Sequence, residues 1–106
     1  MAEIRGFGVV ESQSYYLYVW SDLDANDTGS PITIAGWPDR SVQLVGSGPI
    51  TIEGSMDGVT WGTLSDAAGN DLVLEDNKPR VIGPNVVYIR PNATGAGSIY
   101  IVATRD

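Results

Sequence analysis

The chain has 106 residues, and its 13 acidic and 6 basic side chains give a formal net charge of −7. It contains neither cysteine nor histidine, which excludes disulfides, metal sites built on thiolates or imidazoles, and catalytic triads built on histidine. The length predicts one domain, and the acidic balance argues against a nucleic-acid partner because such a surface repels phosphate backbones.

The first thirteen residues lack the regular alternation of a strand, and they include Gly6 and Gly8. We therefore expect residues 1–13 to be an N-terminal arm or edge segment and residues 14–106 to form a single β-sandwich domain. Residues 1–12 have no long apolar stretch of the kind that a signal peptide needs, and no segment approaches the roughly 18 apolar residues of a membrane helix. We expect a chain made in a cytosol, with no membrane contact.

Thirteen glycines and six prolines divide the chain into short segments, which favours strands and turns over long helices. The strongest strand signal is at 14–20. Further strands are expected at 30–35, 41–46, 50–54, 59–64, 72–74, 80–82, 86–90 and 98–104. Residues 91–97 are interpreted as the last hairpin connection, with Pro91 ending the strand before it because proline has no N–H. This spacing predicts an all-β fold, an antiparallel β-sandwich of about eight or nine short strands, of the jelly-roll or immunoglobulin-like kind.

The alternation of side chains along these strands predicts the core. The residues expected to point inward together are Leu44, Ile52, Trp61, Ile89 and Ile101. Trp61 follows a tight Asp57-Gly58 turn, and two interpretations stand for it. Its ring either fills the core, which we favour, or stacks on a sugar or a partner's ring.

Aromatic residues offer a second candidate surface. Tyr16, Tyr18 and Trp20 share one face of the 14–20 strand, because successive side chains point to opposite sides. That face is either covered by a neighbouring element, which we favour, or half core and half a surface for a glycan or protein partner. Trp37 lies in a loop before Pro38, where it either folds back or contacts a partner.

The loop at 21–29 is acidic. Asp22, Asp24 and Asn26 place oxygens at alternate positions, a spacing that calcium loops use. The helix-loop-helix calcium motif would need Gly and Glu where this chain has Asp27 and Thr33, so we favour a solvated turn and expect no metal or other cofactor. The chain also shows no phosphate-binding loop and no carboxylate pair with a distinguishing environment, so we expect no enzymatic activity.

Several turn motifs follow one another from residue 41 onward. Residues 52–64 read I-x-G-S-x-D-G-x-x-W-x-x-L, residues 66–72 read D-x-x-G-x-x-L, and Tyr88-Ile89-Arg90-Pro91 and a Gly95-Ala96-Gly97 turn follow. This two-thirds of the chain resembles a group of small structural proteins from tailed bacteriophages. The resemblance implies a β-sandwich placed on a virion, and it carries over no catalytic residue.

The function that this resemblance implies is structural. We expect a virion protein, most simply a capsid decoration (cement) protein that stabilises the head shell, with the major capsid protein and further copies of itself as partners, a trimer being favoured by local threefold axes. The residues expected to contact a partner are Ile4, Phe7, Val9, Val10 and Trp37. A tail or head–tail subunit and a carbohydrate-binding module are the alternatives.

Overall fold

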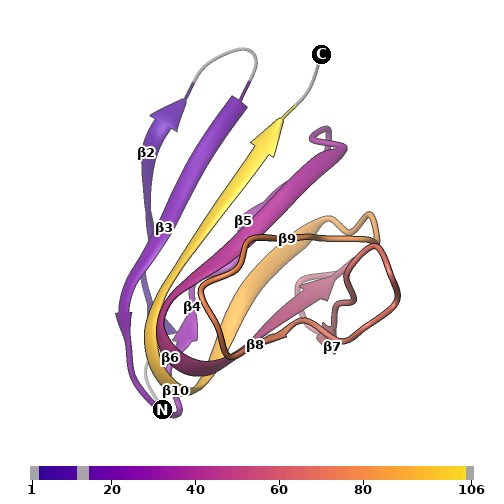
Figure 1. Ribbon diagram of the computed structural model, residues 1–106. Helices are drawn as coiled ribbons and strands as arrows, with labels where there is room; N and C mark the ends of the chain where they lie inside the picture. Colours follow the sequence, from indigo (N-terminus) through magenta and orange to yellow (C-terminus); the bar gives the residue numbers. More distant parts are fainter. Residues whose placement is uncertain (1–2, 12–14, 105–106) are drawn as a thin grey trace.

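The computed structural model describes residues 3–11 and 15–104, apart from the side chains at positions 4 and 9–11 (Figure 1). All the regular structure in this part of the chain is β, which confirms the all-β prediction, and no helix there could cross a membrane. The strands are β1 Glu3–Ile4, β2 Phe7–Glu11, β3 Tyr15–Leu23, β4 Thr28–Gly29, β5 Ile32–Thr33, β6 Asp39–Ser55, β7 Gly62–Thr63, β8 Val73–Leu74, β9 Arg80–Val81 and β10 Tyr88–Thr104.

Two long strands organise the fold. β6 and β10 have 17 residues each and pair antiparallel along nearly their whole length. Both ribbons bend near their middle, so that one pair of strands contributes to two layers (Figure 1). The first half of β6 and the second half of β10 lie with β2, β3 and β9. The other halves lie with β4, β5, β7 and β8, and the core fills the space between the layers.

The strands predicted separately at 41–46 and 50–54 are therefore one continuous strand, and residues 91–97 also lie inside a continuous strand, so the hairpin interpretation of 91–97 is wrong. Pro91 does not end its strand. It is paired with Ile52, at a position where the backbones of β10 and β6 exchange no hydrogen bond. The Ile52 N–H donates to the Leu72 carbonyl at 2.9 Å, and the Ile52 carbonyl accepts from the Leu64 N–H at 2.9 Å. The missing N–H of Pro91 thus costs no bond to β6.

Glycines allow the two strands to bend together. Where β6 and β10 cross the bend, the pairing register shifts between Ala93 and Ala96. A Cβ added to Gly95 would overlap the carbonyl oxygen of Gly48, and Gly48 itself has φ 60°, a left-handed conformation that favours glycine. The bend thus rests on a contact of backbone against backbone that side chains would prevent.

The predicted core is largely confirmed. Leu44, Ile52, Ile89 and Ile101 are all at most 1% exposed, and they pack in one cluster between the layers. Trp61 is the exception, and its placement in the core was wrong. It lies just before β7 on the outside of the second layer, only half-buried, with its ring against the Arg90 side chain.

The N-terminal segment belongs to the sheet wherever it is described. β1 pairs with β4 in parallel, and β2 pairs with β3 antiparallel at the edge of the first layer, with a bulge between Gly8 and Val10. β1 and β2 thus stand at the two ends of the strand order β1-β4-β10-β3-β2.

We predict that Gly95→Ala destabilises the protein severely, because its methyl group would meet the Gly48 carbonyl at the bend. Overpacking against backbone that has no free side chain to move should lower the free energy of unfolding by about 3 kcal/mol. Gly62→Ala is the matched control, since a Cβ there meets nothing within 4 Å. Urea unfolding of both variants tests this, and equal stabilities would contradict the account of the bend.

Candidate functional site

The outer side of the first layer carries an uncovered row of apolar side chains. Leu17 on β3 pairs with Val102 on β10, Val102 pairs with Ser41 on β6, and Ser41 pairs with Val81 on β9, so these side chains share one face. Phe7 and Tyr100 lie on that same face through their common partner Val19. We call this surface the outer apolar face, and its residues are Phe7, Leu17, Val81, Tyr100 and Val102.

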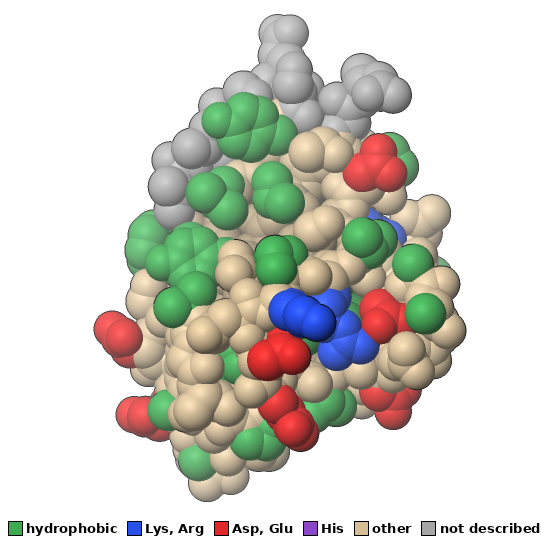
Figure 2. Space-filling view, viewed as in Figure 1, with side chains coloured by type: hydrophobic (Ala, Val, Ile, Leu, Met, Phe, Trp, Pro, Cys, Tyr) green, Lys and Arg blue, Asp and Glu red, His purple; other side chains and the backbone are tan. Residues whose placement is uncertain are grey.

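Exposure of this face is large for apolar side chains. Phe7 and Val81 are each 52% exposed and Tyr100 is 38% exposed, while Leu17 and Val102 are half-buried. Figure 2 shows hydrophobic side chains gathered over β3 and β10, with charged ones grouped below them and to the right. Contiguous exposed apolar patches mark protein or membrane contact sites, ligand-binding grooves or aggregation-prone surfaces.

The face is hollowed by a groove of about 380 Å³, lined by Leu17, Ser41, Val42, Gln43, Pro79, Tyr100 and Val102. Hydrogen bonds fix one wall of this groove. The Gln43 Nε2 donates to the Asn77 carbonyl at 2.6 Å, and the Gly46 N–H donates to the Asn77 side chain at 3.2 Å. These hydrogen bonds within the chain hold the wall of the groove in place. The sequence signal for this groove is the presence of apolar residues on both faces of the strands predicted at 14–20 and 98–104, since one of those faces must point away from the core.

The aromatic face of β3 points the other way, into the molecule. Trp20 is fully buried, and its Nε1 donates to the Ser30 carbonyl at 2.9 Å. From Trp20 a series of ring contacts leads outward, at centroid distances of 5.0 Å to Tyr18, 5.8 Å from Tyr18 to Tyr16, and 6.1 Å from Tyr16 to Trp37. Trp20 is thus excluded from any glycan or partner surface, and Trp37 is folded back onto Tyr16.

Among the expected contact residues whose side chains the structure describes, Phe7 lies on the outer apolar face. The side chains of Ile4, Val9 and Val10 lie outside the described part of the structure. Trp37 lies at the opposite side of the first layer, beside Tyr16.

Trp61 is engaged by a polar group on the outside of the second layer. The Arg90 guanidinium lies 4.2 Å from the centroid of the Trp61 ring, a cation–π contact. Arg90 also pairs with Glu53 at 2.9 Å, and Glu53 accepts a further hydrogen bond from the Asn92 amide at 3.2 Å. A sugar could not stack on the face of the ring that Arg90 covers.

The acidic loop is shorter than predicted, because β3 continues to Leu23. Asp22 and Asn26 adopt positive φ angles of 55° and 72°, and the Asp24 N–H donates to the Asp27 carboxylate at 2.9 Å. Within residues 3–11 and 15–104 no three His, Cys, Asp or Glu side chains gather where they could hold a metal ion. Turn formation accounts for the arrangement of these carboxylates.

Two carboxylates that flank predicted turns also serve the backbone. Asp57 accepts hydrogen bonds from the Thr60 and Val59 N–H groups and from the Ser55 hydroxyl, and these hold the pKa of Asp57 well below its usual range. The Arg80 side chain lowers the pKa of Asp66 and pairs with it at 2.5 Å. Both groups stay ionised near neutral pH, so neither can act as a general acid there.

The chain matches no family model and no curated protein by sequence. Solved structures share its fold at low identity. A conserved protein of unknown function from Streptococcus pyogenes, SPY1581, is 13% identical with a TM-score of 0.58, covering 98% of this chain and 81% of its own. An RmlC-like cupin protein from Desulfovibrio desulfuricans is 9% identical with a TM-score of 0.55, covering 96% and 82%.

A third similar structure is the SPBc2 prophage-derived protein YomS, 11% identical with a TM-score of 0.56, covering 94% of this chain and 91% of its own. At these identities the likeness shows the fold alone. It agrees with the predicted β-sandwich and favours its jelly-roll form, to which cupins belong.

We predict that the two tryptophans differ in their contribution to stability. Trp20→Ala should lower the free energy of unfolding by about 3–5 kcal/mol, because it empties a buried site. Trp61→Ala should cost only about 1 kcal/mol, because it removes a half-exposed ring and one cation–π contact. Urea unfolding measures both, and similar losses would show that the Trp61 ring is packed as a core residue.

Proposed function

We propose that this protein is a non-enzymatic bacteriophage virion protein that works by docking its outer apolar face onto a protein partner. The uncovered groove and apolar side chains of that face carry the proposal, because their exposure costs free energy that a partner's surface would recover. The fold likeness to a prophage-derived protein and the turn motifs from residue 41 onward support the link to phages.

Within a virion, we propose the role of a capsid decoration protein that contacts the major capsid protein and assembles as a trimer. A cement protein acts by adding buried interface between neighbouring capsomers, and the outer apolar face offers surface for such contacts. Phe7 lies at the edge of this face and would take part, whereas Trp37 would not. A tail or head–tail subunit is the alternative, which would use the same face.

The carbohydrate-binding alternative has less support. Of its candidate aromatic residues, Trp20 is buried, Trp37 packs on Tyr16, and Trp61 lies under Arg90. Each ring thus has a contact within the domain that a sugar would have to replace or avoid.

Charged substitutions on the outer apolar face test the proposal. Val81→Lys combined with Tyr100→Lys should weaken binding to undecorated capsids by about thirtyfold or more. This corresponds to a loss of at least about 2 kcal/mol of binding free energy, as expected when central interface residues are replaced. Both positions are solvent-exposed, so the thermal melt should stay close to that of the wild type.

Val59→Lys is the matched control, because Val59 is 80% exposed on the turn before β7, away from this face. It should bind capsids like the wild type. Unchanged binding by the double variant would refute docking through this face. Binding found only on tail fractions, and lost in the double variant, would replace the decoration role with the tail role.

A further inference from the structure

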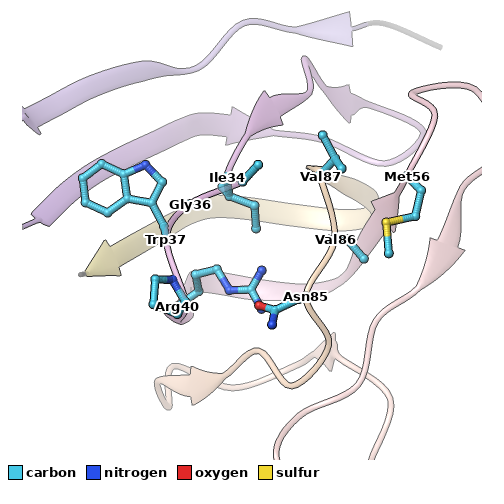
Figure 3. A pocket seen from close by; sticks show the side chains of 10 residues that line it. Ile34, Gly36, Trp37, Arg40, Met56, Asn85, Val86 and Val87 are labelled. Carbon is cyan, nitrogen blue, oxygen red and sulfur yellow. The ribbon is translucent and has the colours of Figure 1, made fainter. Parts of the chain in front are cut away.

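A second cavity lies at the open end of the sandwich, between the loop that precedes β6 and the segment that leads into β10. Its volume is about 360 Å³, within the range of small-ligand sites. Figure 3 shows the side chains around it. The lining residues are Ile34, Ala35, Gly36, Trp37, Pro38, Arg40, Met56, Asn85, Val86 and Val87. We call it the Arg40 pocket, because its walls are mostly apolar and Arg40 is its only charged residue.

Arg40 lies at an inward-facing position of β6. It alternates with the buried Val42 and Leu44 along β6 and pairs with the buried Ala103 on β10. Arg40 is only 3% exposed. Its Nη2 donates to the Pro84 carbonyl at 2.5 Å, while its buried Nε has no acceptor. Burial lowers the pKa of Arg40, and the nearby charge of Asp39 offsets this in part.

Two other arginines have carboxylate partners, which Arg40 lacks within the part of the chain that the structure describes. Arg80 pairs with Asp66 and Arg90 pairs with Glu53, whereas no carboxylate of the described residues lies within ion-pair distance of Arg40. A buried cation without a counter-ion is costly, and a buried donor without an acceptor adds to that cost. A buried polar group without a partner calls for an explanation, and one explanation is a bound group that the chain itself does not supply.

We propose that the Arg40 pocket binds the carboxylate of a ligand whose remainder is apolar. The carboxylate would receive hydrogen bonds from the Arg40 guanidinium, while the apolar part would contact Trp37, Ile34 and Met56. Asn85 also lines this pocket, and its amide would serve as a second donor to the carboxylate.

Several observations favour a carboxylate over a phosphate. The pocket supplies one positive charge, which suits a monoanion, and its walls are chiefly apolar. The chain's net charge of −7 also repels multiply charged anions. The carboxylate could belong to a free small acid or to the end of a polypeptide. This site lies apart from the outer apolar face, so the proposal does not depend on the docking function.

Calorimetric titration with four probes tests the proposal. Hexanoate and N-acetyl-L-leucine should bind saturably, whereas the uncharged N-acetyl-L-leucinamide should bind at least about tenfold more weakly, since it lacks the charge-assisted hydrogen bonds. Tighter binding of N-acetyl-L-leucine than of hexanoate would assign a polypeptide end, and the reverse would assign a free acid. Inorganic phosphate that binds as tightly as either acid would overturn the choice of carboxylate.

Variants locate the site. Arg40→Met should abolish the preference for the acid over the amide, and Arg90→Met, which changes an arginine outside the pocket, should retain it. Should Arg40→Met fail to fold, the wild-type protein still gives an answer, because the Arg40 Nε–H resonance in an NMR titration should shift as hexanoate is added. A saturable calorimetric signal without that shift, or equal binding of acid and amide, would overturn the proposal.

Discussion

The close backbone contact between β6 and β10 at their common bend is the constraint on which the rest of the structure depends. Gly48 and Gly95 approach so closely that a Cβ on Gly95 has no room. Because both strands bend at this point, one continuous ladder supplies the middle of both layers. The core, the outer apolar face and the open end that forms the Arg40 pocket all follow from that bend.

The two layers differ on their outer surfaces. Outside the second layer, Trp61 is covered by Arg90, and Arg90 pairs with Glu53, so polar contacts are made within the chain. Outside the first layer, Val81 and Tyr100 are apolar and are 52% and 38% exposed. A domain that needed only to fold would gain little from such a surface. The proposal of a docking surface on the first layer rests on this difference between the two outer surfaces.

Local patterning was enough to predict the fold class. Alternation in the strands placed Leu44, Ile52, Ile89 and Ile101 in the core, and the glycine and proline spacing excluded long helices. The glycines and prolines at 47–49 and 91–97 led to the wrong prediction that strands end there. Glycine and proline favour a turn and a bend equally, and only the long-range pairing of β6 with β10 decides between them.

The sites were harder to predict for a related reason. Trp61 follows a turn, and whether its ring faces inward depends on the register of a strand only two residues long. The sequence gives no signal that Arg40 is buried, because an arginine beside a loop is normally exposed. Its burial results from the inward alternation that begins at the first residues of β6, which the sequence pattern had started at residue 41.

Hydroxyl-radical footprinting of the protein, free and bound to particles, tests the central claim most directly. If the outer apolar face docks on the particle, Tyr100 and Phe7, exposed in the free protein, become protected on particles. Met56, 68% exposed and placed at the Arg40 pocket, should remain reactive in both states. Equal labelling of Tyr100 and Phe7 in the two states, with protection elsewhere, would contradict docking through the outer apolar face.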